Sequence, residues 1–349
     1  MNVEIWHVKG TRFHFGRHGL GQEKSGAHFP SDSLFAALMA RIAATQGREA
    51  VEAFSARFAN GSPPFVLTSA FPRIGEILFF PPPLISGSKA AAPEGVKPKK
   101  LKKVAYVSEG VFRALIAGSS LEKEWQHCEK FQKDTVLLTR EEAKKLPHEI
   151  TRQTGPEPLW KITRQPRVTI DRATNHSAIY HTGQVIFNKN AGLWFGLRWL
   201  EADAALKRQV ENAFAELGHA GLGGERSSGY GVCEIKRHTE IQLPPPAGKP
   251  WVSLSRYIPK ETEIFALADE VSAYQIETIG GWVRAAQGKK DERRKAVTLL
   301  SEGAVLGALK TDAPGMMVDA QPSYQEKKPL GHPVYRSGFA FGVGLGKGD

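Results

Sequence analysis

The segment at residues 221–231 constrains the fold and function of this chain more than any other stretch. Its sequence is GLGGERSSGYG, with five glycines and one arginine in eleven residues. Glycine adopts backbone conformations that other residues avoid, and it leaves backbone N–H groups open to a ligand. Such N–H groups form concave sites for phosphate oxygens, and an arginine adds a two-pronged hydrogen bond. The segment is therefore either a polyanion clamp or a surface turn, and the loop alone leaves both interpretations open.

The common nucleotide-binding motifs do not fit this segment. A P-loop requires a lysine and a Ser or Thr after its last glycine, and the segment lacks that lysine. The dinucleotide-binding fingerprint runs from a strand into a helix. Here a helical pattern at 203–217 precedes the glycines and a strand-like pattern at 230–241 follows them. Gly218 is expected to end that helix.

The charge balance of the chain favours an anionic partner. Its 349 residues include 47 Lys and Arg against 36 Asp and Glu, a net charge of +11. Such an excess favours nucleic acid or an acidic surface. Cys128 and Cys233 are too few to build a disulfide framework, so we expect a reducing, cytoplasmic location. We expect no signal peptide and no segment that spans a bilayer.

The residue patterns before position 243 predict a β-α-β-β-α-β unit. In chain order they indicate a strand at 3–15, a helix capped by Ser31 and Asp32, strands at 65–71, 77–80 and 193–200, a helix at 203–217 and a strand at 230–241. This order is that of a ferredoxin-like fold. In its RNA-recognition form, the open sheet or its loops contact RNA.

A proline-rich linker at 244–248 divides the chain. We expect a first ferredoxin-like domain over 1–243, with a large insertion at about 85–160, and a second over 249–349. The fold class is therefore α+β, with two tandem ferredoxin-like (RRM-like) domains. Strand candidates of the second domain lie at 251–257, 276–285 and 333–345, and the run at 296–308 fits a strand or a helix.

An exposed β-hairpin with a basic face is expected at about 164–187. Polar and apolar residues alternate around Val168 and Ile170, and residues 161–172 hold four cations and one acid. Arg164, Arg167 and Arg172 are its candidate RNA contacts. The alternative is a basic surface that only contacts another protein subunit.

Four separated segments carry a family resemblance: the glycine-rich loop, residues 29–38 (FPSDSLFAAL), the hairpin, and residues 332–339 (HPVYRSGF). Together they resemble the RAMP superfamily of CRISPR proteins, and within it the fourth subunit of the Csm (type III-A) effector complexes. The resemblance covers most of the chain in order. It implies that the hairpin is a protruding thumb. The equivalent subunit of a Cmr-type complex is a milder alternative.

The resemblance also implies a function and partners. It implies a non-catalytic subunit that holds the 5′ repeat-derived handle of the guide RNA in a cleft between two ferredoxin-like domains. It further implies docking onto a large polymerase-like subunit and onto a backbone RAMP subunit, as part of antiviral defence.

The residues expected to bind RNA lie in the glycine-rich loop, in the hairpin and around the start of the first helix. They are Gly221, Gly223, Gly224, Arg226, Ser227, Ser228, Gly229 and Tyr230, then Arg164, Arg167 and Arg172, and finally Arg17, His18 and Ser31. Tyr230 either stacks on a base or packs as the first core residue of its strand. Ser31 either binds phosphate at the helix N-terminus or only caps the helix.

A guide-precursor endoribonuclease is the alternative from another functional class. Metal-independent RNA cleavage needs a base and an acid, and His14 and His18 are the candidates. We favour RNA contact or solvent exposure for both. The pairs His127–Cys128 and Cys233–His238 do not form a four-ligand zinc pattern. We therefore expect no catalytic residue, no metal and no cofactor.

Overall fold

The computed structural model of this chain describes residues 1–16, 25–84, 98–170, 176–283, 291–322, 330 and 332–346. Of the expected site residues, Arg17, His18 and Arg172 lie outside the described residues. Within the described part, no helix is both long enough and apolar enough to cross a membrane.

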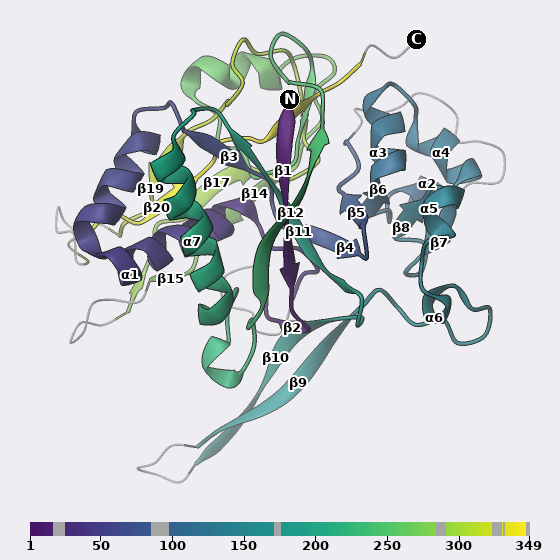
Figure 1. Ribbon diagram of the computed structural model, residues 1–349, viewed down its shortest axis with the longest axis horizontal. Helices are drawn as coiled ribbons and strands as arrows, with labels where there is room; N and C mark the ends of the chain where they lie inside the picture. The colour runs from purple at the N-terminus through teal and green to yellow at the C-terminus, as the bar shows by residue number, and fades with distance from the viewer. Residues whose placement is uncertain are drawn as a thin grey trace.

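One large mixed sheet forms the centre of the molecule (Figure 1). Its strand order is β12-β1-β11-β4-β5-β6-β8-β7, and β3 pairs separately with β11. The β6–β8 pair is parallel and the other pairs are antiparallel. The bounds are β1 (Asn2–Lys9), β3 (Phe65–Leu67), β4 (Phe71–Ile74), β5 (Ile77–Phe80), β6 (Tyr106–Ser108), β7 (Glu129–Phe131), β8 (Val136–Leu138), β11 (Ala191–Trp199) and β12 (Glu234–Gln242).

Two long helices, α1 (Ser31–Ala59) and α7 (Ala204–Ala220), lie together beside the first half of this sheet (Figure 1). The chain thus runs β1, α1, β3 and β4, β11, α7, β12, and the four strands at this end of the sheet are ordered β12-β1-β11-β4. This is the order and connectivity of one ferredoxin-like unit. Aromatic packing joins its layers, because the Trp6 ring lies 5.9 Å from Phe195 and 5.3 Å from Phe214 of α7.

The ends of two predicted elements differ from the sequence-based expectation. Helix α7 does not stop at Gly218 but continues to Ala220, and Gly221 follows with a φ of 87°. Gly218 is instead required by close packing, because a Cβ there would lie 2.6 Å from the Cys233 carbonyl oxygen. The last strand of the unit begins at Glu234 rather than at Tyr230. The first predicted strand, 3–15, is divided into β1 and β2 (Arg12–Phe13).

The predicted insertion extends the large sheet instead of forming a separate body. Besides β6, β7 and β8 it contains α2 (Pro98–Leu101), α3 (Glu109–Ile116), α4 (Leu121–His127), α5 (Arg140–Ala143) and α6 (His148–Thr151). Phe112 of α3 stacks on Phe80 at 4.6 Å, and Phe80 lies 4.7 Å from Trp194 in β11. Its apolar core is therefore continuous with that of the ferredoxin-like unit.

The expected hairpin is present and projects from the rest of the molecule (Figure 1). It consists of β9 (Trp160–Ile170) and β10 (Ser177–Phe187), which pair along their whole length. Strand β2 pairs with the base of β10 through Phe13 and Val185. The hairpin is thereby anchored to the segment that follows β1.

The C-terminal part consists of short strands in small sheets. The bounds are β13 (Trp251–Ser253), β14 (Ile276–Ile279), β15 (Trp282–Val283), β16 (Glu292–Arg293), β17 (Val297–Leu300), β18 (Val305–Leu306), β19 (Met317–Asp319), β20 (Tyr335–Ser337) and β21 (Gly342–Gly344), with a 3₁₀ helix, η2, at Glu261–Leu267. The described residues after the linker include no α-helix. The expected second ferredoxin-like unit, and with it the tandem layout, is therefore not confirmed.

A pair of histidines is packed against the outer strands of the large sheet. The ring of His7 in β1 stacks on His238 in β12 at 4.0 Å, and His238 contacts Glu76 at 2.5 Å. Burial, with the nearby charges of Arg73 and His238, lowers the pKa of His7 to about 3. His7 is consequently neutral in the folded protein at pH values where it is protonated in the unfolded chain, whose histidine pKa is about 6.5.

We expect the free energy of unfolding to fall as the pH is lowered from 7.5 to 5, partly through His7. Between pH 6.5 and 3 the unfolded state binds the extra proton at this position, so protons favour unfolding. The substitution His7→Gln should reduce this pH dependence, measured by urea denaturation at several pH values. The exposed His127→Gln should keep the wild-type profile. Equal pH slopes for His7→Gln and the wild type would contradict the assignment.

Candidate nucleic-acid interface

The glycine-rich loop folds as a compact turn around one 3₁₀ helix, η1 (Arg226–Ser228). Gly221, Gly223, Gly229 and Gly231 have φ values between 81° and 92°. Residues other than glycine rarely adopt this region. Glu225, at φ 55°, is left-handed as well. The sequence of this loop therefore follows in part from its backbone conformation.

Close packing against His14 accounts for two of the glycines. A Cβ on Gly223 would lie 2.6 Å from the carbonyl oxygen of His14, and one on Gly224 would lie 2.8 Å from the His14 ring. The Gly224 N–H donates to the His14 carbonyl at 3.0 Å, and Gly231 donates to the Arg12 carbonyl at 2.9 Å. The loop thus packs on the segment that follows β1, whose strand β2 pairs with the hairpin.

Most backbone N–H groups of the loop are not free to bind a phosphate, contrary to the clamp interpretation. Seven of its backbone N–H groups donate to protein carbonyls, those of residues 221, 222, 224, 228, 229, 230 and 231. The available hydrogen-bonding capacity lies instead at its exposed edge, at Arg226, Ser227, Ser228 and Gly229. The side-chain part of the expected clamp is therefore accessible, and most of its backbone part is not.

Tyr230 is buried at 1% exposure, which favours core packing over base stacking, the two interpretations that its sequence left open. The guanidinium groups of Arg12 and Arg167 lie 5.7 and 5.4 Å from its ring centroid. Its hydroxyl donates to Gln165 Oε1 at 3.3 Å. Tyr230 therefore ties the loop to the hairpin by cation–π contacts. Arg12, which the sequence analysis did not select, belongs to the same contact.

The two described hairpin arginines lie on opposite faces. Side chains alternate along a strand, so Arg164 and Arg167, three residues apart, point to different sides. Arg167 faces the glycine-rich loop. The other face carries Arg164 together with Val168 and Ile179, a cross-strand pair with 57% and 71% exposure. The hairpin thus has an exposed apolar face that the sequence analysis treated only as basic.

The start of helix α1 is not the expected phosphate site. Ser31 is buried, its hydroxyl accepts from the Arg256 N–H at 2.9 Å, and its own N–H donates to Ser69 Oγ at 2.8 Å. The N-cap residue is Pro30, so neither Ser31 nor Asp32 caps the helix as expected. The polar groups of Ser31 are used within the protein. We therefore remove Ser31 from the RNA-binding set.

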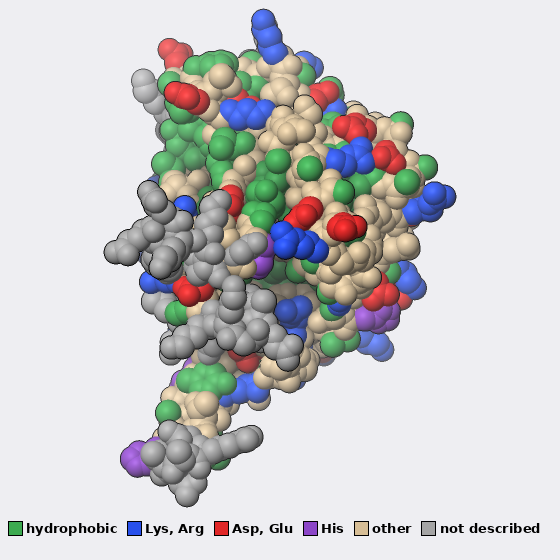
Figure 2. Space-filling model, turned by 90° about the vertical axis from the view of Figure 1, so that its left-hand side faces the viewer, with side chains coloured by type: hydrophobic (Ala, Val, Ile, Leu, Met, Phe, Trp, Pro, Cys, Tyr) green, Lys and Arg blue, Asp and Glu red, His purple; other side chains and the backbone are tan. Residues whose placement is uncertain are grey.

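A cleft of about 1940 Å³ runs between the first helix, the glycine-rich loop and the C-terminal strands. Figure 2 shows this face hollowed, with Lys or Arg side chains inside the hollow and the hairpin projecting below it. Gly221, Gly223, Gly224 and Arg226 line one part of the cleft, and the hairpin contributes Tyr180 and His181. The cleft therefore brings together parts of the two expected RNA-binding elements.

His14 lines the cleft but is nearly buried, with 7% exposure. Its Nδ1 lies 2.6 Å from the Gly183 carbonyl oxygen, which fixes the ring between the hairpin and the loop.

Burial raises the pKa of Cys128 to about 11 and that of Cys233 to about 12, so both thiols are protonated at neutral pH. Within the described residues, no group of three or more His, Cys, Asp or Glu side chains could hold a metal ion.

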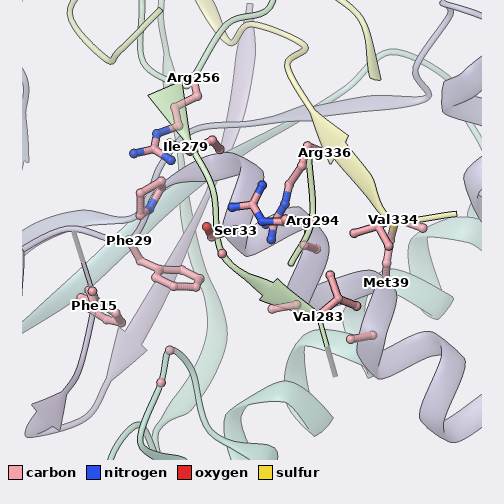
Figure 3. A pocket seen from close by; sticks show the side chains of 18 of the residues that line it. Phe15, Phe29, Ser33, Met39, Arg256, Ile279, Val283, Arg294, Val334 and Arg336 are labelled. Atoms are coloured by element: carbon pink, nitrogen blue, oxygen red, sulfur yellow. The ribbon is translucent and has the colours of Figure 1, made fainter. Parts of the chain in front are cut away.

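Three arginines of the C-terminal part line the cleft, and the sequence analysis selected none of them (Figure 3). Arg256 donates from Nη1 to Asp32 Oδ1 and from Nη2 to Glu277 Oε2, both at 2.9 Å. Arg336 Nη1 lies 3.4 Å from Asp32 Oδ2. Arg294 donates to the Gly280 carbonyl at 2.6 Å. Positions 256, 294 and 336 are far apart in sequence, so no local motif signals the cluster.

Comparison with known proteins gives a consistent family. A family model described as the CRISPR Csm4 C-terminal domain matches residues 247–345. The chain is a Csm4-like RAMP protein. A CRISPR Csm4 protein of Thermococcus onnurineus is 26% identical over 317 residues, covering 90% of this chain and 91% of the relative. One from Methanocaldococcus jannaschii is 24% identical, covering 94% and 93%.

Solved structures show that this Csm4-like chain shares its fold with Csm4 subunits. A Csm3–Csm4 subcomplex of the type III-A interference complex contains a chain with a TM-score of 0.67 and 16% identity, covering 99% of this chain and 100% of that one. A Csm1–Csm4 cassette in complex with cA4 contains one with a TM-score of 0.56 and 19% identity, covering all of both chains. The mixed α+β architecture with its large sheet is therefore the Csm4 fold.

The two glycines Gly223 and Gly229 provide a test of the loop packing. Alanine at either position adopts an unfavourable positive φ, which costs about 1–2 kcal/mol. At Gly223 the new Cβ also meets the His14 carbonyl, whereas at Gly229 nothing lies within 4 Å. Gly223→Ala should therefore lower the free energy of unfolding more than Gly229→Ala, as measured by urea denaturation. Equal losses would show that the loop does not pack as described.

Proposed function

We propose that this Csm4-like chain is a type III-A CRISPR effector subunit that binds the 5′ repeat-derived handle of the guide RNA. The observation that carries the proposal is the cleft that exposes Arg226 beside the anchored hairpin. A guanidinium forms paired, charge-assisted hydrogen bonds with phosphate oxygens. A concave surface with separated cations suits an extended single strand, which is held by phosphate contacts and by its splayed bases.

The proposed RNA ligands are those that the fold leaves accessible. They are Arg226, Ser227 and Ser228 at the loop edge, and Arg167 and Arg164 on the two faces of the hairpin. Gly221, Gly224 and Gly229 are left out, because their backbone N–H groups donate to protein carbonyls. Gly223, which lines the cleft, stays in the set. The buried ring of Tyr230 contacts the Arg167 guanidinium and holds it next to the loop. Arg17, His18 and Arg172 remain expectations outside the described residues.

The proposed partners are the large polymerase-like subunit and a backbone RAMP subunit. Solved Csm3–Csm4 and Csm1–Csm4 assemblies contain chains of this fold, and this supports the proposal. The exposed apolar pair Val168–Ile179 offers a surface suited to protein contact on the hairpin face that points away from the loop. The Csm4 family match favours a type III-A assembly over the Cmr type.

The proposed subunit does not cut its RNA. His14 has one ring nitrogen on the Gly183 carbonyl and little exposed surface, which favours a positioning role over proton transfer. The endoribonuclease alternative, with His14 or His18 as its acid or base, is decided by the assay below.

The first test of the proposed function is direct binding. The full chain is incubated, without divalent metal, with end-labelled RNA that carries the repeat-derived 5′ tag, and bound and cut fractions are measured together. We expect binding without cutting, and we expect scrambling of the tag to weaken it. Specific cutting that is lost in His14→Ala or His18→Ala would overturn the proposal in favour of the endoribonuclease.

Arg226→Ala should weaken the binding of the tagged RNA about tenfold, because one charge-assisted hydrogen-bonded contact is removed. The slope of log affinity against log salt should fall by about 0.7, the value for one phosphate contact on a single strand. Arg208→Ala, on the exposed surface of α7, removes the same charge outside the cleft and serves as the control. Identical affinity and slope for Arg226→Ala and Arg208→Ala would remove Arg226 from the clamp.

A further inference from the structure

One arginine of the C-terminal cluster has no counter-ion within the described part of the chain. Arg294 is buried at 8% exposure, and its side chain makes one hydrogen bond, from Nη2 to the Gly280 carbonyl. Its Nε and Nη1 are buried without a hydrogen-bond partner. Arg256 and Arg336, its neighbours, both pair with Asp32. Arg294 is therefore the member of the cluster whose charge is not balanced by a direct ion pair.

This arrangement is unfavourable for the protein alone. A buried, unpaired charge is strongly penalised, and like charges nearby add to the penalty. Burial, together with the charges of Arg336 and Arg256, lowers the pKa of Arg294 to about 10, and Asp32 offsets this only in part. Arg294 is still charged at neutral pH. A bound anion would supply the charge and the hydrogen-bond acceptors that its guanidinium lacks.

The surroundings of Arg294 leave space for such an anion. Arg294 borders the same cleft as Arg226. It follows β16, and its N–H donates to the Gly281 carbonyl beside β15. A Cβ on Gly280 would meet nothing within 4 Å, so open space borders the backbone whose carbonyl accepts from Arg294 Nη2. A Cβ on Gly281 would lie 3.3 Å from Arg294 Nε, so the guanidinium packs against the backbone at that position.

Apolar side chains of the cleft lie near Arg294. Figure 3 shows Met39 of α1, Val283 of β15 and Val334 on the same side of the cleft as Arg294 and Arg336. The site therefore combines a forked cation with apolar surface. A nucleotide unit matches both, because its phosphate binds guanidinium and its sugar and base pack on apolar side chains.

We propose that Arg294 binds a phosphodiester group of the RNA that occupies the cleft. This assignment rests on the proposed function and extends the RNA path from Arg226, on the ferredoxin-like unit, to the β15–β16 hairpin of the C-terminal part. A carboxylate of a docked protein is the competing occupant. We favour RNA because Arg294 lies inside the concave cleft that Arg226 also borders, rather than on an outer face of the molecule.

The substitution Arg294→Met tests the assignment by two measurements, the affinity for RNA and the melting temperature of the free protein. The variant should weaken the binding of the tagged RNA about tenfold and lower the salt slope by about 0.7. The melting temperature of the free protein should stay equal or rise, because an uncompensated buried charge is replaced by an apolar side chain of similar length. A residue kept only for the fold would show the reverse pattern.

Two further variants complete the experiment. Arg293→Met is the matched control, because Arg293 is exposed and pairs with Trp282 on the opposite face of the same hairpin, so RNA affinity should change little. Arg294→Lys keeps the charge but not the fork, and a partial loss of affinity is expected. This variant keeps the test valid if Arg294→Met does not fold.

The outcomes separate this inference from the proposed function. Weakened RNA binding in both Arg226→Ala and Arg294→Met supports both. Weakened binding in Arg226→Ala with unchanged affinity and salt slope in the Arg294 variants overturns the phosphodiester assignment alone. Loss of binding to the purified large subunit with RNA binding intact would also overturn it, in favour of a protein carboxylate. Absence of tag-dependent RNA binding by the wild-type chain overturns both proposals.

Discussion

The buried carboxylate of Asp32 holds the two parts of this protein together around the cleft. It is fully buried at the start of α1 and contacts Arg256, which follows β13, and Arg336 of β20. A buried carboxylate is stable only when cations and hydrogen bonds compensate the loss of water. The position of the C-terminal strands over α1 is therefore tied to this ion network. The shape of the cleft depends on it in turn.

Polar groups are used differently on the two sides of the cleft. On the side of the glycine-rich loop, backbone N–H groups donate to carbonyls of the loop and of neighbouring segments, so that side chains such as Arg226 present the binding surface. On the C-terminal side, Arg294 is buried and Arg256 and Arg336 are half-buried. Their guanidinium groups have few carboxylates as partners, and Arg256 and Arg336 share Asp32. The first side resembles an exposed phosphate contact. The second resembles a preformed site whose charge balance is completed by a ligand.

The sequence predicted those helices and strands whose residue pattern is set by neighbouring positions in the chain. Alternation around Val168 predicted the hairpin, and helical spacing predicted α1 and α7, because one face of each element is read from neighbouring residues. The glycine-rich loop was selected, but its glycines serve close packing on His14 more than a free N–H cradle. Tyr230 could not be assigned because its burial under Arg12 and Arg167 is a tertiary contact. The arginine cluster as a whole was not predicted, since its members come from three separate segments, and only Arg336 lies in a segment that the sequence analysis selected.

The unlike faces of the hairpin have a consequence for how such a subunit can vary. Arg167 faces the glycine-rich loop, whereas Val168 and Ile179 face the opposite side, because successive residues alternate. Adding or deleting a single residue between the base of β9 and Arg167 would exchange the two faces. The apolar surface would then meet the loop, and the cation would leave Tyr230. We therefore expect related chains to differ in the length of this part of β9 by even numbers of residues, which an alignment of the family can test.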